Sequence, residues 1–423
     1  MKQDFRWNPF ADQPHNVAPR RERFWHHFRY VPSYLSLVSA NVQEAYPVLS
    51  LYRKYRRTMY KEQIKLEHCF GVSVSPLEGR NDGVLENLKD LGILQTLIRI
   101  PSWEKERLVF YQRFIEMVRA RGFDVVLALL QRRKDVKNPE EWLHFLEDVF
   151  ARFKSMCSFF EIGHAWNRTK WGVWDYKEYL KLAEPAVSLA QKYDIKLLGP
   201  AVIDFEFHLY PPILKKIFFD KVTSLLYVDR AGAPENKQFG WDTARKIVLL
   251  KAIVNGCLER NHDLWITEVN WPLEKTGKYS PAVGRANVSE EDQANYLVRY
   301  FVLCLASGHV ERIYWWQLIA PGYGLIDSRP KDWRKRPGFF AFRSMVDRLE
   351  GSIFVEKIPH PDAHIFMFRK GEELVAVCWT PEASVVHMFH RRIQRVENRD
   401  GRELSFHENR IHIDPSPKYV YFF

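Results

Sequence analysis

Polar and aromatic side chains recur at the ends of strand-like segments in this sequence. Glu268 lies in LWITEV, Arg99 in LQTLIRI and Trp316 in RIYWWQL. A carboxylate at the end of a buried strand is unfavourable unless it is paired, so a functional site explains Glu268 better than a core position does. Arg99 would keep that carboxylate ionised, and the Trp316 ring could support a sugar, whose axial C–H bonds form an apolar patch.

Eight short apolar runs, rich in β-branched and aromatic residues, are typical of the buried parallel strands that would position these side chains. They cover residues 69–75, 94–100, 124–130, 158–163, 195–202, 222–228, 264–269 and 312–318. Helical patterns lie between them over 105–121, 139–156, 175–193, 241–259 and 289–307. This alternation predicts a (β/α)8 barrel, in which functional residues gather at the C-terminal ends of the strands. A doubly wound sheet is the alternative, but no Gly-rich phosphate-binding loop follows any of the strands.

The chain changes character on both sides of the predicted barrel. After residue 350, apolar and polar residues alternate between turns at RKGEE and NRDGRE, which predicts antiparallel strands in a small sandwich. Residues 1–32 contain four prolines and look irregular. We therefore expect an α/β protein with a basic N-terminal extension (1–64), a (β/α)8 TIM barrel (65–350) and a C-terminal antiparallel β-sandwich (351–423).

Two segments carry a resemblance to a known family. WITEVNWP and EEDQANYLVRYFVLCLASGHVERIYWWQL resemble the seventh strand, seventh helix and eighth strand of retaining glycoside hydrolases. The clan in question is the (β/α)8-barrel clan with catalytic carboxylates on strands four and seven. The likeness is closest to its xylosidase- and iduronidase-like branch, which also carries a C-terminal β-sandwich. The resemblance implies hydrolysis of O-glycosyl bonds with Glu268 as the nucleophile.

The proton donor of that clan is missing from its usual place. The fourth strand usually ends in Asn-Glu-Pro, whereas this chain has His164, Ala165 and Trp166 there. Ala165 cannot donate a proton, and general acid–base help is typically worth ~10²–10⁴ in rate. Glu161 and His164 are the first candidates to replace it. Loop candidates, which could equally be solvated or structural charges, are Asp204, Glu206, His208 and Glu235.

The other polar and aromatic residues near the strand ends are candidates for sugar contacts. Besides Arg99 and Trp316, they are Gln131, Asn167, Tyr227 and Trp271. No metal and no cofactor are expected, because the histidines are dispersed and His26 and His27 have no acidic pair nearby in sequence. The leading hypothesis is a glycoside-hydrolase-like protein acting on a polysaccharide or glycoconjugate. The alternative is a non-catalytic glycan-binding pseudoenzyme, or an adaptor in cell-envelope polysaccharide assembly.

The net charge of +11 is unevenly distributed. Residues 1–60 carry ten Lys and Arg against four Asp and Glu, which suits a membrane surface or an acidic glycan. No nucleic-acid-binding motif accompanies this arm, so no nucleic-acid partner is expected. The five scattered cysteines and the lack of a signal-peptide pattern indicate a cytoplasmic protein, with the inner membrane as a candidate peripheral surface.

Residues 34–57 combine an apolar stripe with a basic cluster at its end, Arg53, Lys54, Arg56 and Arg57. Pro47 predicts a break in any single helix here. The stripe would serve either as a cap on the bottom of the barrel or as a peripheral anchor on a membrane surface. A cap would bury, and an anchor would expose, the side chains of Leu35, Val38, Val42 and Leu49.

Overall fold

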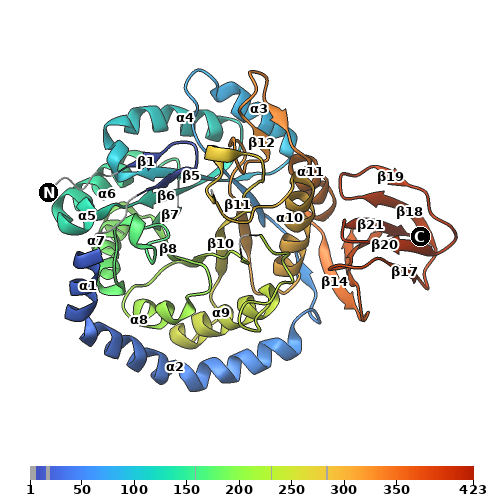
Figure 1. Cartoon of the computed structure of the whole chain (residues 1–423), viewed down its shortest axis with the longest axis horizontal. Helices are drawn as coiled ribbons and strands as arrows, with labels where there is room; N and C mark the ends of the chain where they lie inside the picture. The colour runs from blue at the N-terminus through green and yellow to red at the C-terminus, as the bar shows by residue number, and fades with distance from the viewer. Residues whose placement is uncertain (1–5, 16–19, 158, 230, 283) are drawn as a thin grey trace.

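Eight parallel strands close into a barrel in the computed structural model, which describes residues 6–15, 20–157, 159–229, 231–282 and 284–423 (Figure 1). The strands are β4 (Phe70–Val74), β5 (Gln95–Pro101), β6 (Asp124–Leu130), β7 (Phe159–Ile162), β8 (Lys196–Ile203), β9 (Lys221–Leu225), β10 (Leu264–Val269) and β11 (Arg312–Trp315). Strand β11 pairs with β4 and completes the closure. This closure confirms the predicted barrel. The strands are mostly apolar because the barrel interior covers one face of each strand and the surrounding helices cover the other.

Helices surround the barrel on its outside (Figure 1). They are α3 (Asn81–Leu91), α4 (Leu108–Ala120), α5 (Arg133–Lys137), α6 (Pro139–Phe153), α7 (Tyr176–Tyr193), α8 (Tyr210–Leu214), α9 (Thr243–Leu258), α10 (Glu290–Leu305) and α11 (Pro337–Leu349). Three begin where Asp175, Asp242 or Ser289 accepts a hydrogen bond from a backbone N–H of the first turn. Helices and strands share one continuous apolar core, which holds the strand ends on a rigid frame.

A two-layered antiparallel β-region follows the barrel and confirms the predicted β-sandwich. Its strands are β14 (Ile353–Ile358), β15 (His364–Lys370), β16 (Glu373–Trp379), β17 (Val385–Met388), β18 (Ile393–Asn398), β19 (Glu403–Leu404), β20 (Arg410–Ile413) and β21 (Lys418–Phe422). The larger sheet has the order β19-β18-β21-β16-β15-β14-β3, with β3 (Ile64–Lys65) contributed by the N-terminal extension. The β17–β20 pair forms the smaller layer, and a second apolar core joins the two.

The N-terminal extension is more ordered than its prolines suggest. Strands β1 (Trp7–Asn8) and β2 (Gln13–Pro14) pair as a hairpin, and α1 (Arg20–Arg29) and α2 (Val31–Thr58) follow. Within the described part of residues 1–32, the prediction of irregular structure is therefore wrong. Pro14 lies in a two-stranded ribbon, and Pro32 lies in the first turn of α2, where no backbone N–H is needed.

The predicted break at Pro47 is also wrong, because α2 is one helix of 28 residues. A proline removes the hydrogen bond to the carbonyl four residues earlier, here that of Gln43. Gln43 lies on the exposed side of the helix, where water can bind the freed carbonyl. The inner side is held against α9, where Val48 packs on Gly256 and Asn255 donates to the Tyr55 hydroxyl at 2.7 Å.

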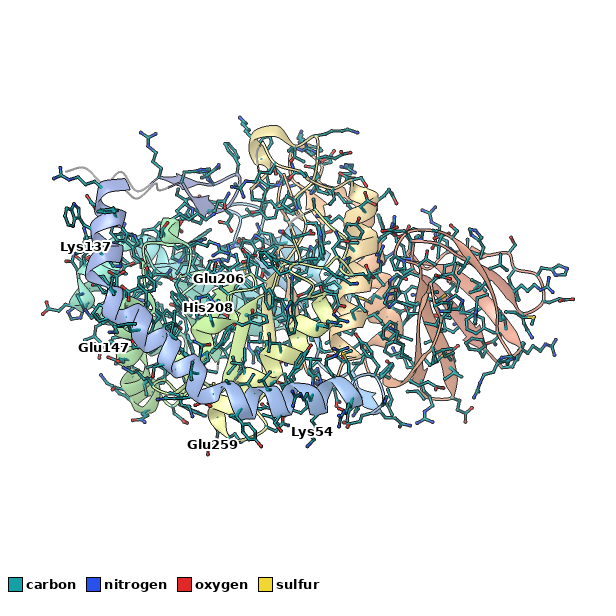
Figure 2. All side chains as sticks on the ribbon, turned by 60° about the horizontal axis from the view of Figure 1, so that its bottom comes forward. Lys54, Lys137, Glu147, Glu206, His208 and Glu259 are labelled. Carbon is teal, nitrogen blue, oxygen red and sulfur yellow. The ribbon has the colours of Figure 1, made fainter. Side chains whose placement is uncertain are left out.

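The outer side of α2 remains uncovered. Leu35, Val38, Val42 and Leu49 are all more than half exposed, so the expectation that a cap would bury them is wrong. Different side chains, Leu37 and Val48 among them, face the barrel instead. Figure 2 shows α2 lying along the outside of the molecule, with Lys54 on its outer side. Within the described chain, no helix combines the length and apolarity that crossing a membrane requires.

Candidate active site at the mouth of the barrel

A cavity of about 550 Å³ opens at the C-terminal ends of the barrel strands. Its wall includes Arg99 of β5, Glu268 of β10, Tyr227 after β9 and Trp316 after β11. The expected convergence of Arg99, Glu268 and Trp316 on one mouth of the barrel is thus observed. Separate strands deliver these four side chains to one place, as in other barrels whose sites lie at this end.

Both carboxylate oxygens of Glu268 are held by hydrogen bonds. The Tyr227 hydroxyl donates to Oε1 at 2.5 Å, and an Arg99 amino group donates to Oε2. Burial raises the pKa of Tyr227, so its hydroxyl keeps the proton that it donates. A carboxylate that is bound through both oxygens has a fixed orientation and a stabilised negative charge.

Arg99 contacts four other side chains of the site. Its Nη2 contacts Glu268 and donates to His164 Nε2 at 3.0 Å, whereas its Nη1 donates to Asp12 Oδ2 at 3.3 Å. Its guanidinium carbon lies 3.2 Å from the centroid of the Trp316 ring. Because Arg99 covers one face of that ring and Tyr323 stacks beside it, Trp316 supports the arginine rather than offering an open platform. Burial lowers the pKa of Arg99, and the Asp12 carboxylate opposes that effect.

His164 is a neutral hydrogen-bond acceptor in this site. Burial lowers its pKa well below the ordinary value, and the charge of Arg99 adds to the effect. Since Arg99 donates to Nε2, the ring proton is assigned to Nδ1, and Nε2 has no proton to give. Gln131 fixes the His164 backbone, accepting from its N–H at 2.8 Å and donating to its carbonyl at 3.0 Å.

Ala165 lies on the cavity wall where the resemblance predicts the proton donor. Its backbone adopts the left-handed conformation, with φ of 43°, and its carbonyl accepts a hydrogen bond from the Arg168 N–H at 2.9 Å. The methyl group is buried and has no proton to donate. A carboxyl group for this task must therefore come from another part of the chain.

The N-terminal hairpin brings into the cavity a further carboxylate, which no local sequence pattern marks as functional. Asp12, in the turn between β1 and β2, lines the wall and binds Arg99. Trp7 holds the hairpin in place by packing against Trp103 and Trp171, with ring centroids 5.1 and 6.1 Å away. Gln13 adds a hydrogen bond to the Pro281 carbonyl at 2.9 Å. Burial raises the pKa of Asp12, Arg99 opposes this effect, and Glu104 adds to it.

Glu161, a first candidate for the missing acid, lies inside the barrel rather than on the cavity wall. It is 1% exposed and accepts a hydrogen bond from the Thr267 hydroxyl at 2.6 Å. Burial raises its pKa to about 7. That value would suit a general acid, but proton transfer first requires hydrogen-bond reach of the substrate.

The loop candidates are engaged elsewhere. Asp204 lines the cavity, but both it and Glu206 form ion pairs with Arg168. Glu235 pairs with Arg299 and accepts from the Trp379 indole at 2.7 Å, which joins the barrel to the β-sandwich. His208 is exposed near α2, and its carbonyl accepts from Asn41.

Three of the predicted sugar-binding residues, Gln131, Asn167 and Trp271, shape the loops instead of lining the cavity. Asn167 bonds to both the N–H and the carbonyl of Ile203, at 2.9 and 3.0 Å. Trp271 donates to the Gly232 carbonyl at 2.8 Å and stacks on Trp315. These contacts hold the ends of neighbouring strands together.

Basic side chains surround the acidic residues of the cavity. Arg168, Lys170 and Arg285 line it together with Arg99. Burial lowers the pKa of Lys170 to about 8, and the nearby arginines add to the effect. Lys170 donates to the Gln13 side chain, so the hairpin also covers this charge.

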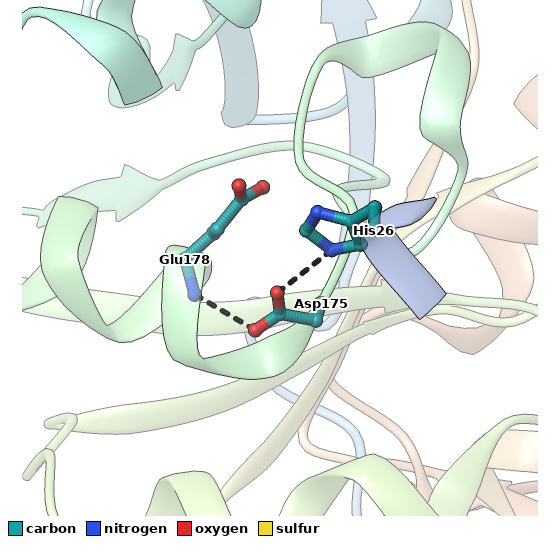
Figure 3. A group of neighbouring side chains, drawn as sticks. All are labelled: His26, Asp175 and Glu178. Atoms are coloured by element: carbon teal, nitrogen blue, oxygen red, sulfur yellow. Dashed lines mark hydrogen bonds and ion pairs between the residues drawn. The ribbon is translucent and has the colours of Figure 1, made fainter. Parts of the chain in front are cut away.

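A separate cluster of metal-ligand type lies between α1 and α7. Figure 3 shows His26, Asp175 and Glu178, whose ligand atoms lie within 4.8 Å of one another. His26 therefore has two acidic neighbours in space, although no acidic pair lies near it in sequence. Asp175 Oδ1 caps α7, Oδ2 bonds to His26 at 3.0 Å, and Glu178 pairs with Arg133 at 2.6 Å. Because Arg133 already supplies the positive charge, the cluster is best explained as a clasp that holds α1 on α7.

The fold is that of known glycoside hydrolases. No protein-family model and no curated protein matches the chain. A family 39 glycoside hydrolase from Bacteroides cellulosilyticus WH2 superimposes with a TM-score of 0.67 at 15% identity, covering 85% of this chain and 81% of that one. A GH30 endoxylanase from Clostridium papyrosolvens C71 gives 0.59 at 13% identity, over 86% and 98%. The GH51 arabinofuranosidase from Xanthomonas axonopodis pv. citri gives 0.56 at 12% identity, over 86% and 98%.

Proposed function

We propose that the chain is a carbohydrate-active enzyme that cleaves O-glycosyl bonds with retention, with Glu268 as the nucleophile. The observation that carries this proposal is the fixed carboxylate of Glu268, held through both oxygens by Tyr227 and Arg99 at the cavity wall. Such a carboxylate has a fixed orientation, as attack on an anomeric carbon requires. The similarity of the fold to that of glycoside hydrolases supports the same reaction class.

In this proposal Asp12 replaces the missing proton donor. Asp12 and Glu268 bind different amino nitrogens of the Arg99 guanidinium, so both carboxyl groups lie beside the same cation at the cavity wall. Retaining enzymes need their proton donor close to the nucleophile, with the two carboxyl groups about 5–5.5 Å apart, and the shared guanidinium brings Asp12 near Glu268. The raised pKa of Asp12 favours the protonated form that a donor needs.

The proposed hydrolysis has two steps. Glu268 bonds to the anomeric carbon while the bond to the leaving oxygen breaks, and Asp12 gives its proton to that oxygen. In the second step a water molecule attacks the anomeric carbon, the Asp12 carboxylate takes the proton of that water, and the bond to Glu268 breaks. Arg99 pairs with Glu268 in the resting site and holds this carboxyl group in place for the first step.

The test uses a panel of aryl glycosides whose leaving groups differ in acidity. Glu268→Gln should abolish turnover of all of them, and a 2-deoxy-2-fluoro glycoside should label Glu268 in the wild-type protein by mass spectrometry. Asp12→Asn should retain kcat/KM on dinitrophenyl glycosides and lose about 10²–10⁴-fold in kcat/KM on poor leaving groups, while its kcat falls because the second step lacks its base. Glu206→Gln, which neutralises a carboxylate on the loop after β8, is the control and should leave the rates on all leaving groups unchanged. Equal losses of Asp12→Asn on all leaving groups would reject Asp12 as the donor.

A second candidate function is glycan binding without cleavage, as in an adaptor for cell-envelope polysaccharide assembly. Ala165 at the usual donor position is the observation that favours it. An adaptor would bind an oligosaccharide with an affinity that Glu268→Gln leaves unchanged, and it would turn over no aryl glycoside. Turnover of an activated glycoside that is lost in Glu268→Gln would exclude this alternative.

A further inference from the structure

The outer side of α1 and α2 carries an unusually continuous apolar surface. Leu35, Val42 and Leu49 follow one another at intervals of seven residues. Val31 and Val38 are also seven residues apart. Seven residues make nearly two helical turns, so these side chains form one stripe along α2. The exposed stripe, here named the outer stripe, comprises Phe24, Trp25, Phe28, Val31, Tyr34, Leu35, Val38, Val42, Tyr46 and Leu49.

The outer stripe is too long to be ordinary surface scatter. Tyr46 is 84% exposed, and Leu35 and Val42 are each 68% exposed. From Val31 to Leu49 the stripe extends about 27 Å along the helix, at 1.5 Å per residue. Single exposed apolar residues are normal on soluble proteins, but a contiguous apolar strip of this length marks an interaction surface.

The charges next to the outer stripe define its partner. Arg53, Lys54, Arg56 and Arg57 follow it directly and are all exposed. Glu44, the acidic residue within the length of α2, is buried on the inner side and paired with Lys215. An apolar strip with a basic end suits an anionic lipid surface, where the basic residues meet the headgroups and the apolar residues enter the interface.

A second copy of the chain fits this surface less well. The sequence of α1 is also basic, with Arg20, Arg21 and Arg23 against Glu22. Two helices paired in parallel would bring basic cluster against basic cluster, and an antiparallel pair would bring residues 53–57 near α1 of the other copy. Both arrangements place like charges together, which disfavours association.

We propose that the outer stripe and the basic cluster of α2 dock the protein onto an anionic bilayer surface, with the long axis of α2 in the plane of the interface. The aromatic side chains Trp25, Tyr34 and Tyr46 lie at the headgroup level, where amphipathic rings are favoured. This docking is peripheral and reversible. It uses no residue of the cavity, so it does not depend on the proposed reaction of Glu268.

The test measures co-sedimentation of the full chain with phosphatidylcholine vesicles with and without phosphatidylglycerol. Leu35→Glu/Val42→Glu should abolish binding, since it places charge in the apolar strip. Replacing Arg53, Lys54, Arg56 and Arg57 with Gln should weaken binding to anionic vesicles about a hundred-fold or more, because each basic residue contributes ~1 kcal/mol near such a surface. High salt should also weaken the binding of the wild type to anionic vesicles.

Two matched variants control for the loss of surface apolarity and charge. Val109→Glu/Val386→Glu changes two exposed valines outside the outer stripe, and quadruple replacement of Lys89, Lys105, Arg391 and Arg392 removes as many exposed positive charges elsewhere. Both should bind vesicles like the wild type. Failure of the wild type to bind anionic vesicles at low salt, or equal binding by the stripe variant, overturns the proposal. A lipid-free dimer that Leu35→Glu/Val42→Glu dissociates would also overturn it, in favour of a second copy.

Discussion

The guanidinium of Arg99 rests 3.2 Å from the centre of the Trp316 ring. This contact fixes the plane of the guanidinium, and that plane decides where Asp12 and Glu268 can bind it. A planar group with several fixed N–H bonds can hold two carboxylates at once, which a lysine ammonium at the same place could not do in the same geometry. The site is therefore organised around one buried cation that two carboxyl groups share.

Arg99→Met should destabilise the protein by about 3–5 kcal/mol at pH 7, because Asp12 and Glu268 lose their shared cation. The loss should be smaller at pH 5, because the raised pKa of Asp12 favours its neutral form, which needs no cation beside it. Chemical denaturation at both pH values measures it. Arg285→Met, at an exposed position of the same cavity, is the control and should change stability by less than about 0.5 kcal/mol. An Arg99→Met variant with wild-type stability would show that the shared cation is not needed to hold the two carboxylates.

Glu161→Gln should become increasingly more stable than the wild type as the pH rises. Burial raises the pKa of Glu161 from 4.5 to about 7. Between these values the folded chain holds a proton that the unfolded chain has released, so wild-type stability falls as the pH rises. Glutamine cannot ionise, so the difference in free energy of unfolding should grow by about 3 kcal/mol between pH 4.5 and 8. Denaturation curves of Glu161→Gln and the exposed control Glu259→Gln check this, and parallel pH dependences would contradict it.

Trp7→Ala should loosen the N-terminal hairpin without unfolding the barrel. Trp7 contacts Trp103 and Trp171, and loss of such aromatic packing locally is worth about 1–2 kcal/mol. Amide hydrogen exchange in residues 7–15 should accelerate about tenfold, while exchange in the barrel strands stays unchanged. Trp25→Ala removes an exposed tryptophan of α1 and should have no such effect. Unchanged protection of residues 7–15 in Trp7→Ala would mean that other contacts hold the hairpin.

Ala165→Glu should restore part of the activity that Asp12→Asn loses on poor leaving groups. Ala165 lines the cavity, and its left-handed backbone is about as unfavourable for glutamate as for alanine. In the Asp12→Asn background, we expect at least a tenfold recovery of kcat/KM on alkyl glycosides. Ala165→Gln has the same shape without the proton, and it should give no recovery. Equal rates for the two variants would show that position 165 cannot reach the leaving oxygen.

The barrel and its strand ends were predictable from sequence because each strand is a continuous apolar run with its own helix. Glu268 and Arg99 interrupt such runs, so their polar character stands out against the pattern. Three other polar or aromatic residues also lie near strand ends, yet their side chains bind backbone groups of neighbouring loops. They are Gln131, Asn167 and Trp271. Nothing in the local sequence distinguishes a polar group that faces a cavity from one that holds a loop.

Asp12 could not be predicted because its position depends on contacts far along the chain. The strands beside it have two residues each, too few to show a period. Its place is set by Arg99 and, through Gln13, by Pro281. The continuity of α2 through Pro47 could not be predicted for a similar reason. Packing of α2 on α9 outweighs the local tendency of proline to end a helix.

The path of the N-terminal extension has a consequence for the order in which the protein assembles. The hairpin binds the mouth of the barrel, α2 packs on α9, and β3 joins a sheet whose other strands come from the C-terminal region. This extension thus has partners that are synthesised much later than it is. Contacts this distant in sequence close slowly, because a long loop must be ordered before they form. Asp12 and Glu268 share Arg99 only once the strands that carry Arg99 and Glu268 have both been made, so a partly made chain has no complete site.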